Sequence, residues 1–166
     1  MTSPYQNIAC FIDHDDASMA ALAEARRLSE IGRGKLKLAH VAPDPILSST
    51  GPYGFVAAPE DLYRSAEAWI RKQAAAIPGA QAVLLRGYPP AAACDYAEEA
   101  GVDLIVLAAH RGLVRRVMLG SFAGYVAYHA PCPVLVVPPS PTSEAEGAEG
   151  DDEALASTGR AGGATD

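Results

Sequence analysis

The chain has 166 residues, enough for one domain of ordinary size, and 49% of them are hydrophobic, so it can bury a core. Its net charge of -7 lies mainly at the end of the chain, because residues 139–166 contain seven acidic residues and one basic residue, for a charge of -6. Residues 1–138 then carry thirteen acids and twelve bases, or -1, which argues against a basic face for nucleic acid.

The cysteines and the start of the chain indicate a cytoplasmic protein. The three cysteines lie far apart and form no CxxC pair, so neither a disulfide framework nor a cysteine-based zinc site is expected, and no metal-binding residues are predicted. The first residues lack the basic region and long apolar run of a signal peptide. No segment reaches the ~20 apolar residues that a membrane span requires, so no membrane partner is expected.

Five apolar runs predict strands. Most of these runs are continuous, as expected for a parallel sheet that is covered on both faces. The predicted strands are Ile8–Ile12, Leu36–Val41, Ala82–Leu85, Leu104–Ala108 and Val134–Val137.

Helical patterns fill the segments between these strands. Residues 18–32 follow a capping Asp15 or Asp16 and are expected to end at Gly32 or Gly34. Further helices are predicted over residues 58–77, over 89–101 with a proline opening, and from about Gly120 onward. In the helix over 58–77, Trp69 is expected in the core or an interface and Leu62 on the same face.

The regular alternation of strands and helices predicts one α/β domain with right-handed crossovers and helices on both faces of a parallel sheet. We assign this domain to residues 1–138. Two other segments differ from it in composition. Residues 43–58 are rich in proline and glycine and predict a long, irregular connection. The acidic tail, residues 139–166, is predicted to be disordered because it contains a single large aliphatic residue.

Ligands of open α/β sheets bind beyond the carboxyl ends of the strands, where the winding reverses. Asp13 ends the first predicted strand and could accept hydrogen bonds from a ribose, although it could equally be a helix cap. After the fourth strand, Gly112 allows the backbone to approach a phosphate closely. Gly120 and Ser121 then open a helix whose free N–H groups favour an anion, or they are an ordinary turn and cap.

Four basic residues in the same segment could neutralise a phosphate chain, although such a run is more often simply solvated. They are His110, Arg111, Arg115 and Arg116.

Nearly all of residues 5–138 resemble the universal stress protein (UspA-like) family. The segments that carry this resemblance are NIACFIDHDDASMAALAEARRLS, LAHVA, RGYPPAAACDYAEEAGVDLIVLAAHRG and GSFAGYVAYHAPCPVLVVP. The resemblance implies a Rossmann-like, open five-stranded parallel sheet in the order 3-2-1-4-5. It also implies a homodimer formed through the last strand, here Val134–Val137.

The resemblance further implies an ATP site, because the family members that bind ATP share a G-x2-G-x9-G-[S/T] loop after the fourth strand. The loop positions correspond here to Ala109, Gly112, Gly120 and Ser121, and Phe122 follows them. Asp13 and Val41 correspond to the positions next to the ribose and the adenine.

The loop departs from the family pattern in two ways. Ala109 replaces the first glycine, and its methyl group would block close approach if the position needed positive φ. Seven residues instead of nine separate Gly112 from Gly120, which shortens the arch around the phosphates. Asp15, where the family commonly has serine, would bring a second negative charge near the phosphates, and Mg²⁺ could compensate for it.

The leading hypothesis is therefore a non-enzymatic stress-response module whose dimer or partner contacts respond to an adenine nucleotide, with slow ATP hydrolysis at most. A second hypothesis is an interaction protein that has lost nucleotide binding, as the altered loop would allow. A phosphorylated receiver domain is rejected, because Arg86 and Gly87 stand at the end of the third predicted strand instead of aspartate, and the fifth is followed by prolines instead of lysine. The sequence does not favour a nucleotide-transferring enzyme, because neither of the phosphate-binding motifs GxGxxG and GxxxxGK[ST] occurs.

Overall fold

The computed structural model describes residues 5–43, 59–111 and 117–139. The predictions for the connection over 44–58, for Gly112, Arg115 and Arg116, and for the acidic tail from 140 onward lie outside these residues. For His110, Arg111, Val117 and Met118 the backbone is described and the side chains are not.

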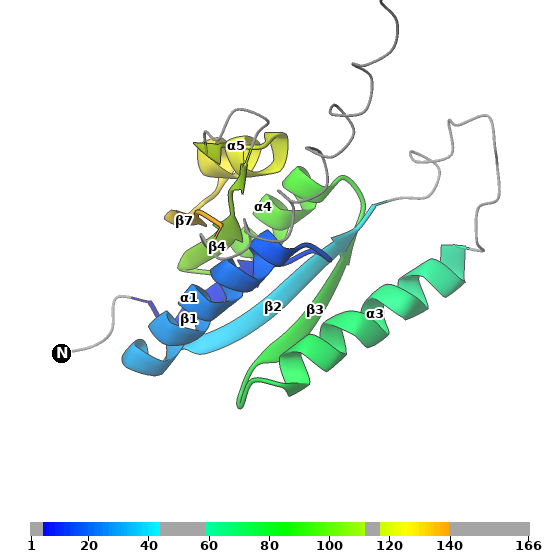
Figure 1. Ribbon diagram of the computed structural model, residues 1–166, viewed down its shortest axis with the longest axis horizontal. Coiled ribbons are helices and arrows are strands. Elements are labelled where there is room, and N and C mark those ends of the chain that lie inside the picture. Colours follow the sequence, from blue (N-terminus) through cyan, green and yellow to red (C-terminus); the bar gives the residue numbers. More distant parts are fainter. Residues whose placement is uncertain (1–4, 44–58, 112–116, 140–166) are drawn as a thin grey trace, which may run out of the picture.

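The described chain forms a five-stranded parallel sheet in the order β3-β2-β1-β4-β7 (Figure 1). Counted along the chain, this is the expected order 3-2-1-4-5. Two strands have the predicted limits, and the other three differ by one residue at each end. The strands are β1 (Asn7–Phe11), β2 (Lys35–Ala42), β3 (Gln81–Arg86), β4 (Leu104–Ala108) and β7 (Val134–Val137).

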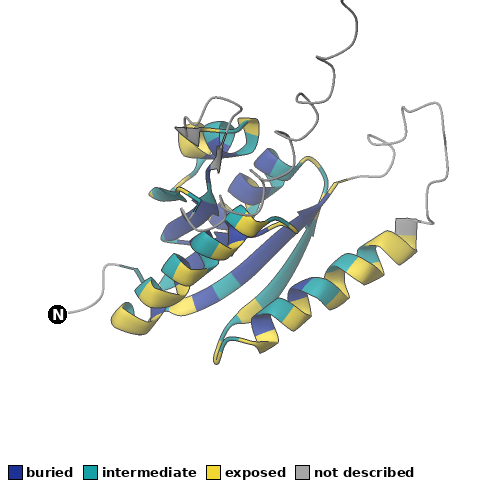
Figure 2. Ribbon diagram, viewed as in Figure 1, coloured by how far each residue is buried: buried dark blue, intermediate teal, exposed yellow. Residues whose placement is uncertain are grey.

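Two helices cover each face of the sheet. On one face, α1 (Asp16–Gly32) and α3 (Pro59–Ala75) pack on alternate strand residues such as Ile8 and Cys10. On the other face, α4 (Pro89–Glu99) and α5 (Ser121–His129) pack on the intervening ones, such as Ala9 and Phe11. The central strands are therefore buried on both faces, while the outward faces of the helices are exposed (Figure 2). This burial explains the continuous apolar runs in the sequence.

The second half of α3 makes its core contacts. Ile70 and Ala74 are buried, and Trp69 packs against the same core, as expected. Leu62, which helical spacing places on the same face, is instead 45% exposed. It lies in the first turns of the helix, whereas the core contacts come from residues further along.

The ends of α1 show which of the predicted capping residues begins the helix and which residue ends it. Asp15 is the N-terminal cap, and its carboxylate accepts a hydrogen bond of 2.8 Å from the N–H of Ser18. The left-handed position that ends the helix is taken by Arg33, with φ 53°, and not by the glycine on either side of it. Glycine usually takes this position because it has no Cβ to clash.

A short antiparallel ribbon was not predicted. It consists of β5 (His110–Arg111) and β6 (Val117–Met118), between β4 and α5. Each strand has only two residues, too few to show the alternation by which strands are recognised.

Candidate functional site

A pocket of about 510 Å³ opens at the carboxyl ends of β1, β2 and β4. In the sheet, β2 lies on one side of β1 and β4 lies on the other, so the direction of winding reverses at β1. The carboxyl ends of the strands at such a reversal are the usual ligand position in an open α/β sheet. Apolar residues dominate its wall, and the polar groups come mostly from the residues after β1. The lining residues are Phe11, Ile12, Asp13, His14, Asp15, Ser18, Ala39, His40, Val41, Pro43, Pro89, Leu107, Ala108 and Phe122.

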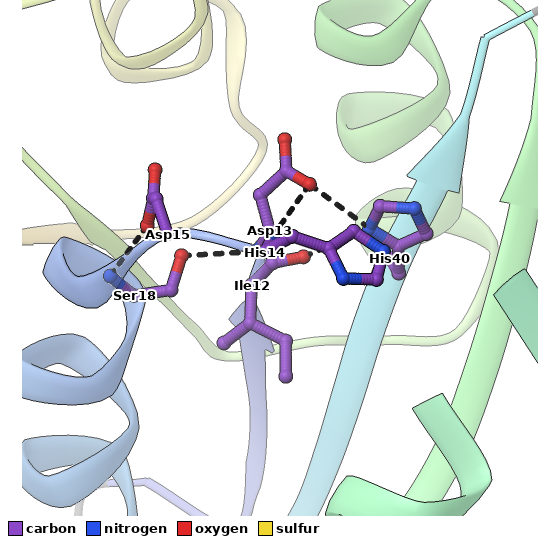
Figure 3. Close-up of polar contacts among 6 residues, drawn as sticks. All are labelled: Ile12, Asp13, His14, Asp15, Ser18 and His40. Atoms are coloured by element: carbon purple, nitrogen blue, oxygen red, sulfur yellow. Dashed lines mark hydrogen bonds and ion pairs between the residues drawn. The ribbon is translucent and has the colours of Figure 1, made fainter. Parts of the chain in front are cut away.

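The segment between β1 and α1 is held by local hydrogen bonds (Figure 3). The N–H of Asp13 donates to Ser18 Oγ at 2.9 Å, and the N–H of His14 donates to Asp13 Oδ1 at 2.8 Å. Because Asp15 caps α1, the alternative that Asp13 is the cap is wrong. The Asp13 side chain is 71% exposed and has acceptor capacity left for a ligand.

Three rings gather beside Asp13. The His14 ring lies against the Trp69 ring with centroids 3.9 Å apart, and both lie near the His40 ring, at 5.6 and 5.1 Å. His40 is buried, and its Nδ1 lies 3.0 Å from the carbonyl oxygen of Ile12. Since a carbonyl only accepts, Nδ1 carries the proton in this hydrogen bond. The same nitrogen is 3.9 Å from Asp13 Oδ1.

The structure brings three of the predicted site residues together in the pocket. Asp13, Val41 and Phe122 all line it. Val41 is buried near the end of β2, and Phe122, in the first turn of α5, lies against Phe11 with ring centroids 6.1 Å apart. These side chains supply one carboxylate and two apolar surfaces.

Of the other predicted residues, the three that the structure describes do not line this pocket. Ala109 is 1% exposed, and its N–H donates to the carbonyl oxygen of Val137 at 2.8 Å, so it continues the pairing of β4 with β7. Ala109 is not among the described residues with positive φ. Gly120 and Ser121 lie at the start of α5, where Gly120 caps the helix without a side-chain hydrogen bond. Gly112 lies outside the described residues.

The cluster of Asp13, His14 and His40 was not predicted. One possible metal-ligand atom from each of these residues lies within 4.8 Å of the other two. The sequence does hold a signal for it, because His14 follows β1 and His40 lies near the end of β2, and the carboxyl ends of adjacent parallel strands meet at one edge of a sheet.

The doubly wound sheet, with a pocket at its switch point, defines a Rossmann-like α/β protein. The model of the universal stress protein family matches residues 4–138. The chain is also 30% identical over 140 residues to universal stress protein YxiE of Bacillus subtilis (strain 168), covering 76% of this chain and 94% of that protein. The chain therefore belongs to the universal stress protein family.

Solved structures agree with this assignment. The universal stress protein UspA from Lactobacillus plantarum is 28% identical with a TM-score of 0.64, covering 80% of this chain and 97% of that one. A universal stress protein in complex with cAMP is 26% identical with a TM-score of 0.55, covering 82% and 98%. Among the described residues, no helix has both the length and the apolar character needed to cross a membrane.

Proposed function

We propose that this universal stress protein is a cytoplasmic, non-enzymatic stress-response module that binds an adenine nucleotide, ATP with Mg²⁺, in the crevice between β1 and β4. The observation that carries the proposal is the pocket at the carboxyl ends of these strands, with Asp13, Val41 and Phe122 in its wall. Its volume of about 510 Å³ falls within the usual range for small-molecule sites.

Each of these three side chains has a distinct part in the proposed complex. The exposed carboxylate of Asp13 accepts hydrogen bonds from the ribose hydroxyls, and Val41 and Phe122 cover the faces of the base. A structural neighbour of the same family has been solved with cAMP, itself an adenine nucleotide, which supports this class of ligand.

The phosphates are assigned to Gly112, Gly120 and Ser121. The described part of this arrangement is the start of α5, whose cap offers no side-chain acceptor to the first N–H groups of the helix. Such groups, together with the positive end of the helix dipole, favour an anion. The hydroxyl of Ser121 is in an exposed residue and adds a donor.

The test is a calorimetric titration of the purified protein with Mg-ATP and, separately, with adenosine. We expect saturable binding of both, tighter for ATP. Asp13→Ala should weaken both ligands by about 10-fold or more, the equivalent of one hydrogen bond to a charged group. Ser121→Ala should weaken ATP and leave adenosine unchanged. Asp95→Ala, which removes an exposed carboxylate on α4, is the matched control.

A second candidate function is a nucleotide-independent interaction module of the same family. The specific observation in its favour is the N–H of Ala109, which pairs with Val137 in the sheet and is not available to a phosphate. The absence of heat at millimolar ATP and adenosine, from a folded protein free of co-purified nucleotide, would establish this alternative and exclude the first proposal.

The module is proposed to act as a homodimer formed through β7. This strand is at the outer edge of the sheet and pairs only with β4 among the described residues. All four of its residues are half-buried. An edge strand with free main-chain groups can add the same strand of a second copy.

A further inference from the structure

We propose that Asp13, His14 and His40 form a binding site for a divalent transition-metal ion of the Zn²⁺ type. Each residue offers one ligand atom, and the three atoms lie within 4.8 Å of one another. Imidazole nitrogen suits Zn²⁺ and similar ions, whereas Mg²⁺ prefers an all-oxygen environment. Two imidazoles and one carboxylate therefore favour Zn²⁺ over the Mg²⁺ that accompanies a nucleotide. The proposal does not depend on nucleotide binding.

The sheet fixes the backbone positions of the cluster. Phe11 of β1 is in register with Ala39 of β2, and the N–H of Ile12 donates to the carbonyl oxygen of Ala39 at 2.9 Å. Asp13 and His14 therefore leave β1 beside His40, the next residue of β2. Of the three residues, His40 lies on a strand, and strands hold the side chains of a site more precisely than loops do.

His40 is the fixed member of the cluster. It is 8% exposed, and its Nδ1 contacts the Ile12 carbonyl oxygen at 3.0 Å and lies 3.9 Å from Asp13 Oδ1. Its ligand atom is one of the two ring nitrogens. A neutral imidazole binds a metal ion through one nitrogen and carries its proton on the other, and the hydrogen bond that the second nitrogen donates orients the ring.

Asp13 and His14 are the movable members. Ligand atoms at 2.0–2.2 Å from a tetrahedral Zn²⁺ lie roughly 3.3 Å apart, so the atoms must approach one another from their present separation. Both residues are exposed and extend from the segment after β1, so their side chains can turn toward His40. Three protein ligands leave a fourth position open to water or to a small molecule in the pocket.

Trp69 provides a direct readout of this movement. It is the only tryptophan of the chain, and its ring centroid lies 3.9 Å from that of His14. Turning the His14 ring toward a metal ion changes the surroundings of the indole, so its fluorescence reports binding without a label.

The experiment is a titration of the nucleotide-free, full-length protein with Zn²⁺, and separately with Mg²⁺, followed by tryptophan fluorescence and by calorimetry. We expect one saturable Zn²⁺ site in the wild type and no fluorescence change with Mg²⁺. His14→Ala and His40→Asn should each weaken Zn²⁺ binding at least about 10-fold. Removing a residue that only hydrogen-bonds to a metal ligand already costs about 10-fold or more in metal affinity, so removing a ligand itself should cost at least as much. His129→Ala, which removes an exposed histidine on α5, should leave the affinity unchanged.

His40→Asn separates the metal-binding role from a structural one. The asparagine amide can still donate to the Ile12 carbonyl oxygen, so circular dichroism should show a folded protein. Equal Zn²⁺ affinity in the wild type, His14→Ala and His40→Asn would overturn the proposal, as would a folded wild type that binds no Zn²⁺. Because no nucleotide is present, either result would leave the nucleotide proposal standing.

Discussion

Gly34 lies where the chain passes from α1 toward β2 and meets the backbone that leads into β1. A Cβ placed at this position would lie 2.7 Å from the carbonyl oxygen of Tyr5, closer than real Cβ atoms come. The N–H of Gly34 also donates to the carbonyl oxygen of Ser29 at 3.1 Å, which holds the turn against the end of the helix. Close packing of two backbones therefore requires glycine here, independently of φ.

Gly34→Ala should lower the free energy of unfolding by roughly 1–3 kcal/mol, because the added methyl group forces the backbone to shift. Gly124→Ala is the matched control. Within α5, the nearest described atom to its new Cβ would be in the Leu119 side chain, at 3.9 Å, and alanine should raise the stability by about 0.5–1 kcal/mol. Urea unfolding of both variants measures the difference, and effects of the same sign would contradict the steric explanation.

Cys10 shows at the same scale how burial controls chemistry. It lies on β1 with no exposed surface, whereas Cys132 is only half-buried. Removal from water disfavours the thiolate, which raises the pKa of the Cys10 thiol from 9.0 to about 12. The unfolded chain therefore releases this proton at a lower pH than the folded protein.

The stability of the protein should consequently fall as the pH rises above 9. Below the unfolded pKa of 9.0 both states keep the proton, and between that value and about 12 only the folded state does. For this one group the loss between pH 8 and pH 10 is about 1.4 kcal/mol. Cys10→Ala lowers the stability by a constant amount and removes this pH dependence. Urea unfolding at pH 8 and pH 10 should show that the free energy of unfolding falls by about 1.4 kcal/mol more in the wild type than in Cys10→Ala. Equal losses in the two proteins would contradict this prediction.

The elements that the sequence predicts best are those whose pattern covers several residues. The continuous apolar runs of β4 and β7 predict those strands with the observed limits, because alternate residues of each strand pack against the cores on the two faces of the sheet. The two-residue strands β5 and β6 escape prediction because backbone pairing alone defines them. The end of α1 is predicted at a glycine, but Arg33 takes the left-handed position instead, and its N–H donates to the carbonyl oxygen of Ser29.

Arg33→Gly should raise the free energy of unfolding by roughly 0.5–1 kcal/mol. The left-handed conformation costs an L-residue about 1–2 kcal/mol, and the greater entropy of glycine in the unfolded chain offsets part of the gain. Arg33→Ala removes the same charge and keeps the Cβ, so it should give no comparable stabilisation. Thermal unfolding of the Arg33→Gly and Arg33→Ala variants measures the difference. If alanine stabilised the protein as much as glycine, the cause would be the lost charge and not the left-handed backbone conformation.

At the scale of the whole molecule, the place of the site in the fold can be predicted from the sequence more completely than the set of residues that form it. Asp13 follows β1 and Val41 lies near the end of the adjacent β2, so strand order is enough to bring them to one pocket. The cluster of His14, His40 and Trp69 also depends on the position of α3 on the sheet, because α3 carries Trp69. Helical spacing in the sequence does not give this position. The role of Ala109 depends on how far β7 continues along β4, which the apolar runs do not show.

Strand β7 is one of the two edge strands of the described sheet, and β3 is the other. Along β7, the carbonyl groups of Pro133 and Val137 accept hydrogen bonds from Ile105 and Ala109, next to or within β4. Main-chain groups alternate sides along a strand. Leu135 therefore also faces β4, and the N–H groups of Val134 and Val136 face away from it. These outward groups are the ones that a second copy of the strand would use.

Val136→Pro should therefore prevent the proposed dimer and leave the fold intact, because it removes an outward N–H that makes no bond within the sheet. Leu135→Pro is the matched control. It removes an N–H that faces β4 and should destabilise the monomer by roughly 1–3 kcal/mol, the cost of an unsatisfied buried group. Sedimentation equilibrium should show a wild-type dimer and a Val136→Pro monomer with unchanged circular dichroism. A Val136→Pro protein that still dimerises would show that the subunits associate through another surface, and a monomeric wild type would remove the dimer from the proposed function.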